Sequence, residues 1–391
     1  MKLTYALAAM IVLCASSMHA ADSTATPAAA PITWSGFVDA YYSKNFNSPS
    51  TSTNQFRNFD INENQFAFSL AELVVQKQAS PVGFRMDLDF GPTNDIVQGL
   101  PSVPTVVPGT NTTVVSNTLN ILQQAYLTAL LPIGSGLTVD VGKFVTHMGY
   151  EVIESKDNWN YSRSFMFAYA IPYWHTGVRA SYTFSSTFSA AVHFVNSWNT
   201  VIDNNSSHSL GLMLNYAVTP STDIIFNGMS GFEQPFLSPY GKRDVADFIV
   251  TQNVNDMLSL GINADYGQER LGGSSGHLAM WKGAAIYGKC TLNPKSALAL
   301  RAEVYSDPFV YTLVAGYNPS YYQANPFVNT KETLTEVTLT YEYHLFDPLI
   351  TRLEFRDDMS NNAGLFNTAS ASPSPSAKSQ PTLLVGVIAT F

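Results

Sequence analysis

Residues 336–346 read EVTLTYEYHLF, and this short stretch decides the fold. Apolar and aromatic side chains occupy every second position from Val337 to Leu345, and polar side chains fill the positions between them. Successive side chains of a β-strand point to opposite faces, so a period of two predicts a strand with one apolar and one polar face. Residues 82–90 and 258–267 alternate in the same way.

Segments with this alternation recur along the chain from Thr33 onward. We count about sixteen, at residues 33–43, 65–78, 82–91, 121–131, 136–146, 173–185, 187–199, 208–219, 221–232, 245–254, 257–267, 279–292, 296–306, 334–346, 348–358 and 381–391. Tight turns join some neighbours, and long polar loops join the others. The long loops cover residues 44–64, 92–120, 147–172, 307–331 and 359–380.

Short turns at one end and long loops at the other are typical of bacterial transmembrane β-barrels. We therefore predict an all-β fold, an antiparallel transmembrane barrel of about sixteen strands with short periplasmic turns and long extracellular loops. An even number of strands places both termini on the periplasmic side. A hairpin within 92–120 or 307–331 would raise the number of strands to eighteen.

The composition favours a membrane barrel over a soluble protein. Charged residues make up 13% of the 391 residues, and hydrophobic residues make up 46%. Soluble globular proteins carry about 25% charged residues. No apolar run beyond the N-terminus reaches the roughly 20 residues of a membrane helix, and a closed barrel is the other structure that satisfies its backbone within lipid. The alternative is a soluble all-β protein with many hairpins, whose surface would carry more Lys and Glu.

The first twenty residues have the pattern of a secretory signal peptide. Lys2 precedes an apolar stretch at 3–13, and a small residue, Ala20, ends the segment. We expect cleavage after Ala20, a flexible N-terminal leader over 21–32, and a barrel over 33–391. The mature chain would keep one cysteine, Cys290, which excludes an intramolecular disulfide.

The last strand also carries an export signal. Residues 381–391 alternate and end in Phe391. A terminal aromatic residue on an apolar alternating strand resembles the C-terminal assembly signal of outer-membrane proteins. We therefore expect the barrel-assembly machinery to bind this strand, and outer-membrane lipids to surround the folded barrel.

Several stretches resemble the OmpL-like family of β-barrel porins from Gram-negative bacteria. The best matches are 71–97, 122–155 and 158–184, and weaker matches occur at 299–308 and 336–358. The resemblance implies an outer-membrane porin, a water-filled channel for passive diffusion of small hydrophilic solutes and ions. It identifies no particular solute. Analogy with general porins also implies a homotrimer.

The same analogy predicts that the third long loop, 147–172, folds into the lumen and narrows it. This loop is rich in aromatic and charged residues, as a segment packed inside a barrel would be. Its charged candidates for the constriction are Glu151, Glu154, Lys156, Asp157 and Arg163. The alternative is an ordered surface loop with no contact to the pore.

Charged residues on the polar faces of the strands are candidates for the opposite wall of the pore. They are Arg85, Asp87, Asp89, Asp140, Arg179, Arg301, Glu303, Glu342, Arg352, Glu354 and Arg356. Arg or Lys facing lipid at mid-membrane costs about 2–4 kcal/mol, so these positions should face the lumen. There they would either select solutes by charge or form cross-strand ion pairs that brace the wall. The net charge of −9 predicts a mild preference for cations.

Other functional classes fit the sequence less well. We expect no enzyme, because no H-E-x-x-H motif occurs, and because residues 272–276 (GGSSG) read as a flexible loop between two strands. Cofactor-binding loops, metal-ligand clusters and basic nucleic-acid patches are also missing from the sequence. A TonB-dependent transporter would need a plug domain before the barrel. An outer-membrane receptor or adhesion barrel with a closed lumen stays open as an alternative, because loop 307–331 is rich in aromatic residues.

Overall fold

A computed structural model describes most of the chain beyond the N-terminal segment. The described residues are 30–98, 105–106, 113–114, 120–203, 205, 207–234, 241–271, 277–314, 330–362, 364–369 and 377–391. The signal peptide expected at 1–20, and most of the leader expected at 21–32, lie outside these residues. The middle of loop 307–331 lies outside them as well.

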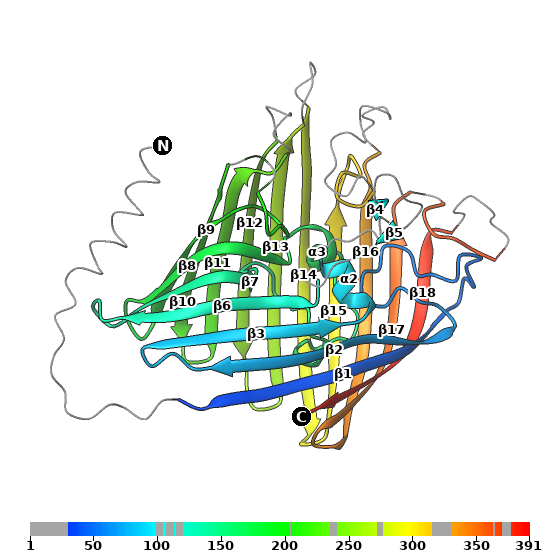
Figure 1. The fold of residues 1–391 in the computed structure, drawn as a ribbon. Helices are drawn as coiled ribbons and strands as arrows, with labels where there is room; N and C mark the ends of the chain where they lie inside the picture. The colour runs from blue at the N-terminus through cyan, green and yellow to red at the C-terminus, as the bar shows by residue number, and fades with distance from the viewer. Residues whose placement is uncertain are drawn as a thin grey trace.

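Sixteen strands of the described chain form one closed antiparallel barrel (Figure 1). They are β1 (Ile32–Asn45), β2 (Gln65–Lys77), β3 (Val82–Phe90), β6 (Leu122–Leu131), β7 (Leu137–Val145), β8 (Trp174–Thr183), β9 (Phe188–Val195), β10 (Ser209–Thr219), β11 (Thr222–Phe232), β12 (Lys242–Asn253), β13 (Leu258–Arg270), β14 (Leu278–Asn293), β15 (Ser296–Ser306), β16 (Thr333–Phe346), β17 (Leu349–Ser360) and β18 (Ser379–Thr390). Each strand pairs with its neighbours in chain order.

The predicted strands are confirmed, with ends that differ by at most four residues. The largest difference is at β9, which ends at Val195 instead of Asn199. The alternative of eighteen barrel strands is wrong, because the barrel closes with sixteen strands of the described chain. Segment 92–120 does contain a small hairpin, β4 (Thr105–Val106) and β5 (Thr113–Val114), but these two strands form a separate sheet. Helix α2 (Pro92–Val97) precedes them.

Pairing between β1 and β18 closes the barrel. The amide of Gly36 donates to the carbonyl of Phe391 at 3.1 Å, and the amide of Phe391 donates back to Gly36 at 3.0 Å. Closure leaves no strand edge unpaired, which a sheet within lipid requires. The chain enters β1 and leaves β18 at the end of the barrel that carries the short turns (Figure 1).

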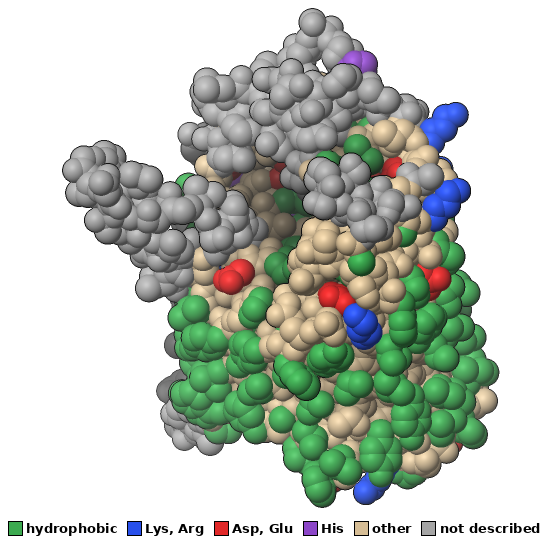
Figure 2. All heavy atoms as spheres, turned by 90° about the vertical axis from the view of Figure 1, so that its right-hand side faces the viewer, with side chains coloured by type: hydrophobic (Ala, Val, Ile, Leu, Met, Phe, Trp, Pro, Cys, Tyr) green, Lys and Arg blue, Asp and Glu red, His purple; other side chains and the backbone are tan. Residues whose placement is uncertain are grey.

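The alternation of the sequence separates the two faces of the wall. Val337, Leu339 and Tyr341 remain 43%, 49% and 41% exposed on the outside, whereas Thr338 and Thr340 are fully buried within. Figure 2 shows hydrophobic side chains gathered over the lower part of the wall, where few charged side chains lie among them. In the described part of the chain, no helix is long and apolar enough to cross a membrane.

Candidate functional site

The segment 147–172, here called the inner loop, packs against the inward face of the wall. It connects β7 to β8 and contains a 3-10 turn, η1 (Ser155–Asp157), and a short helix, α3 (Phe165–Tyr169). Figure 1 places α3 within the ring of strands. Tyr161 and Phe165 are fully buried, and they share one hydrophobic core with Trp281 and Ile388 of the wall. The core of this protein therefore lies inside the barrel.

Helix α3 is fixed by its first turn. The Ser164 hydroxyl accepts a hydrogen bond from the amide of Phe167 at 3.0 Å, as an N-cap residue does. The amides of Phe165 and Met166 donate to the two carboxylate oxygens of Glu303, on β15, at 2.7 and 2.6 Å. A carboxylate is favoured there because the first amides of a helix lack partners and carry partial positive charge.

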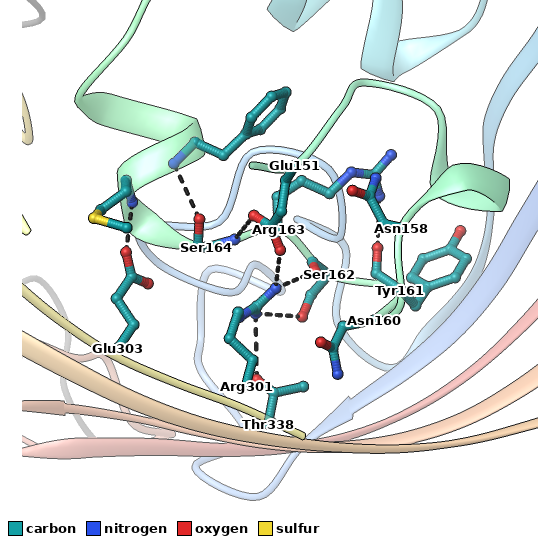
Figure 3. A network of polar contacts seen from close by, with 12 residues as sticks. Glu151, Asn158, Asn160, Tyr161, Ser162, Arg163, Ser164, Arg301, Glu303 and Thr338 are labelled. Carbon is teal, nitrogen blue, oxygen red and sulfur yellow. Dashed lines mark hydrogen bonds and ion pairs between the residues drawn. The ribbon is translucent and has the colours of Figure 1, made fainter. Parts of the chain in front are cut away.

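Three buried wall arginines donate hydrogen bonds to carbonyl oxygens of the inner loop (Figure 3 shows the first of them). Arg301 donates to Ser162 at 2.6 Å. Arg352 donates to Ser155 at 2.5 Å and to Asn158 at 2.7 Å. Arg356 donates to the carbonyl oxygen of Arg163 at 2.5 Å. Hydrogen bonds with one charged partner contribute about 1.5–3 kcal/mol each, so these side chains hold the inner loop in place.

Wall carboxylates neutralise the same three arginines. The ion pairs are Arg301–Glu336 at 2.5 Å, Arg352–Glu342 at 2.7 Å and Arg356–Asp358 at 2.6 Å. Arg301–Glu336 and Arg352–Glu342 each join two neighbouring strands, whereas Arg356–Asp358 lies within β17. Each of the three guanidinium groups contacts a carboxylate of the wall and a carbonyl oxygen of the inner loop.

Other wall carboxylates accept hydrogen bonds from the inner loop. Glu354 accepts from the amides of Tyr161 and Ser162 at 2.6 and 3.0 Å. Asp39, on β1, accepts from the hydroxyls of Ser155 and Tyr161 at 2.6 and 2.5 Å. Sequence reasoning missed Asp39, since a single acidic residue on a polar strand face gives no sign of its partner.

Glycines in the wall make room for side chains of the inner loop. A Cβ atom at Gly386 would lie 2.4 Å from the Tyr161 ring, and one at Gly283 would lie 2.5 Å from Met166. Two further pairs follow the same rule, Gly211 with His147 and Gly261 with Tyr150. Glycine within a strand often marks such a close approach, and this is a signal that the sequence did contain.

The first long loop, residues 44–64, also contacts the inner loop and the wall that anchors it. Arg57 donates to Asp358 on β17 at 2.6 Å, and the Asn58 amide donates to the Tyr173 hydroxyl at 2.7 Å. Phe59 packs against Phe167, with ring centroids 5.8 Å apart. Arg57 is buried and was not among the predicted site residues.

The wall formed by β2, β3 and β6–β8, here called the open wall, carries two arginines that keep partial contact with water. Arg85 pairs with Asp87 at 2.9 Å, and Arg179 pairs with Asp140 at 2.7 Å. The two arginine side chains remain 34% and 23% exposed. Arg85 also lines a cavity of about 470 Å³. Residues on both sides of the turn between β2 and β3 line the same cavity.

The sixteen charged residues predicted for the site fall into two sets. One set holds the inner loop or its anchors: Glu151, Arg163, Arg301, Glu303, Glu342, Arg352, Glu354 and Arg356. The other set lies on the open wall or on the facing stretch of the inner loop: Arg85, Asp87, Asp89, Asp140, Glu154, Lys156, Asp157 and Arg179.

Two carboxylates of the open wall have oxygens without a hydrogen-bond partner among the described residues. Glu72 on β2 and Asp89 on β3 are paired in register, and both are buried. Among the described residues, neither carboxylate oxygen of Asp89 has a hydrogen-bond partner, and one oxygen of Glu72 has none. Glu154 of the inner loop lies close enough for its charge to act on both. Burial raises the pKa of Glu154 above its ordinary value.

Three histidines gather where the inner loop leaves β7. His147 stacks on His193 with ring centroids 4.0 Å apart, and it lies 6.3 Å from His175. Burial lowers the pKa of His147 to about 3, so this side chain is neutral at physiological pH. In the parts of the chain that are described, no group of His, Cys, Asp or Glu has the arrangement of a metal site.

Comparison with known proteins agrees with this architecture. The family described as "Putative beta-barrel porin-2, OmpL-like" matches residues 31–391. Among curated proteins, none matches the chain.

Three solved structures share the fold at low sequence identity. The outer-membrane channel DcaP of Acinetobacter baumannii superposes with a TM-score of 0.57 at 11% identity, over 94% of this chain and 99% of that one. The trimer form of OmpT from Vibrio cholerae gives 0.58 at 11% identity, over 93% and 100%. The anion-selective porin from Comamonas acidovorans gives 0.57 at 10% identity, over 93% and 100%.

Proposed function

Because this chain belongs to the OmpL-like family of β-barrel porins, we propose that solutes cross it through the gap between the inner loop and the open wall. The protein is an outer-membrane porin, and its family and fold are those of a channel rather than of an enzyme. The pore passes small hydrophilic solutes and ions by passive diffusion.

The observation that carries this proposal is the one-sided attachment of the inner loop. Its hydrogen bonds with Arg301, Arg352, Glu303, Glu354 and Asp39 run to β15, β17 and β1. The Gly149 amide also donates to Asp247 on β12 at 2.8 Å. The loop therefore covers that side of the lumen. The partly exposed arginines of the open wall lie on the side that it leaves free, which supports an aqueous path there.

The anchoring also bears on how the channel works. Hydrogen bonds with one charged partner fix the loop at several places along its length. A loop held in this way keeps the constriction at one width. Such a pore conducts without a gating step.

The charged residues on this path, or buried in the wall beside it, would set its selectivity. They are the second set defined above, with Arg85, Asp87, Asp89, Asp140 and Arg179 on the wall and Glu154, Lys156 and Asp157 on the inner loop. Fixed charges at a constriction favour ions of the opposite sign. Acidic side chains are more numerous than basic ones in this set, so the pore prefers cations.

Assembly of the barrel would depend on its two ends. Residues 1–20 would direct export, and the barrel-assembly machinery would bind the last strand through Phe391. The position of Phe391 supports this role, since its backbone pairs with Gly36 and its side chain stays exposed on the outside. A homotrimer is the assembly that we propose, and one structural neighbour is described in a trimer form.

Single-channel recording tests the proposed function. The protein is refolded from denatured material, which excludes contamination by other porins, and it is added to a planar lipid bilayer. Stable open steps in KCl are expected, together with swelling of liposomes in small sugars. Silence from correctly folded barrels would refute an open pore and would favour a receptor or adhesion barrel with a closed lumen.

A further inference from the structure

Glu72 and Asp89 form an arrangement that is costly for a sheet. They lie directly opposite each other on β2 and β3, where Cβ atoms of paired residues are about 4.5–5.5 Å apart. Like charges in such a pair are destabilising. Burial without a hydrogen-bond partner adds a desolvation cost to each free oxygen. A group that offsets these costs is expected nearby.

The neighbouring basic side chains are engaged elsewhere. Arg85 directs its Nε to both oxygens of Asp87, at 2.9 and 3.0 Å. Lys143 donates to the side chain of Gln98 at 2.6 Å and to the carbonyl of Leu122 at 2.7 Å. Lys156 pairs with Asp157 on the inner loop.

Asp87 differs from Glu72 and Asp89 because its charge is neutralised. Besides Arg85, it accepts a hydrogen bond from the side-chain amide of Gln124 at 2.5 Å. Lys143 and Lys156 lie close enough for their charges to act on these carboxylates, but they donate no hydrogen bond to them. An excess of negative charge is therefore left on Glu72, Asp89 and Glu154, here called the acidic cluster. Glu154 is half-buried and reaches the lumen, whereas Glu72 and Asp89 lie behind it in the wall.

We infer that the acidic cluster is a binding site for the ammonium or guanidinium group of a solute in transit. This inference rests on the proposed function, since the ligand arrives through the pore. Glu154 supplies the direct contact. Glu72 and Asp89 face each other too closely for both to ionise, and the charge that the pair keeps adds negative potential from within the wall, where screening by water and salt is weak. The site makes organic cations the preferred solutes of this channel.

L-Arginine and L-citrulline provide a matched pair of probes, because they have nearly the same size and differ in the charge of the terminal group. Open steps of the refolded protein are first recorded in dilute KCl, and one of the two amino acids is then added. Arginine is expected to lower the potassium current in a saturable way, and citrulline is expected to leave it nearly unchanged.

Substitutions of the same shape assign this effect to the cluster. Asp89→Asn and Glu154→Gln should each raise the half-blocking concentration of arginine on the order of tenfold, as loss of one nearby charge implies. Asp223→Asn is the control, because Asp223 also faces inward but lies on β11, away from the cluster. It should change the half-blocking concentration less than twofold.

The outcomes separate the two proposals. Equal block by arginine and citrulline, or an unchanged half-blocking concentration in Asp89→Asn and Glu154→Gln, would overturn the binding site and leave the porin function intact. The second result would mean that the acidic cluster does not contact arginine. Silence before any amino acid is added would overturn the pore itself and the site with it. Heat modifiability on gels checks that each variant is folded.

Discussion

Replacing Arg301 with methionine should release part of the inner loop. Its guanidinium is fully buried, and it donates to Glu336 at 2.5 Å, to Glu151 at 2.6 Å and to the carbonyl of Ser162 at 2.6 Å. Methionine keeps much of the side-chain volume but removes the charge. Two buried carboxylates and one loop carbonyl then lose a donor.

The size of the effect follows from burial. Breaking a buried ion pair by removing one partner costs about 3–5 kcal/mol, because the remaining charge stays in a poorly solvated place. Arg301→Met should therefore lower the free energy of unfolding by about that amount. The free energy of unfolding of Arg301→Lys should lie between those of the parent and of Arg301→Met, since lysine restores the charge but not the forked geometry.

Two measurements separate loop release from general instability. Urea titration of barrels refolded in lipid vesicles gives the free energy of unfolding. Trypsin reports the loop, since cleavage after Lys156 requires that this part of the inner loop leave the lumen. The matched control is Arg179→Met, which removes a wall arginine that pairs with Asp140 and remains partly exposed. We expect this control to cost less than Arg301→Met, because Arg179 is partly exposed and touches no carbonyl of the inner loop, and we expect no new cleavage.

The reasoning would be refuted by an Arg301→Met barrel that unfolds at the same urea concentration as the parent and resists trypsin equally well. That result would mean that Arg301 contributes nothing net to holding the inner loop. Cleavage in both Arg301→Met and Arg179→Met would also contradict it, because the loop contacts of Arg301 would then be irrelevant.

Three further predictions concern other parts of the molecule. Gly386→Val should push Tyr161 away, lower the free energy of unfolding by about 1–3 kcal/mol and produce noisy single-channel currents. Gly288→Val is the control, because the nearest atom is 3.8 Å from an added Cβ there, and its currents should stay quiet. Quiet currents in both variants would contradict the fit of loop to wall. The raised pKa of Glu154 means that the folded protein binds this proton more tightly than the unfolded chain, so stability from this group is present at low pH and falls as pH rises through the raised pKa. Reversal potentials should accordingly show a cation preference that weakens on mild acidification, and Glu154→Gln should remove that pH dependence; an unchanged pH dependence in the variant would assign it to another group. Phe391→Ala should reduce the amount of barrel in the outer membrane of cells but refold normally in pure lipid vesicles, whereas equal loss in both would indicate a folding defect instead of a recognition defect.

The strands could be predicted from the sequence because alternation is a local property. In residues 336–346 the polarity of each side chain indicates which face of the sheet it lies on, and neighbouring turns determine where the strand ends. The inward position of Arg301 and Glu303 follows from the same pattern. The fold and the faces were therefore predictable almost throughout the barrel.

The partners of the inward charges could not be predicted in the same way. Arg301 binds Ser162, 139 residues away, and Glu303 binds the amide of Phe165, 138 residues away. Such contacts depend on the path of a loop through the lumen, and no local pattern encodes that path. A carboxylate that holds a loop, such as Asp39, and one that lacks a partner, such as Asp89, look alike within a strand.

The position of Tyr161 has a consequence for how the barrel is completed. Its hydroxyl binds Asp39 on the first strand, its amide binds Glu354 on the next-to-last strand, and its ring lies against Gly386 on the last. This one residue thus touches both sides of the seam where the chain closes on itself. The complete set of contacts exists only after the two ends of the chain have met. Closure of the barrel and completion of its constriction therefore depend on each other.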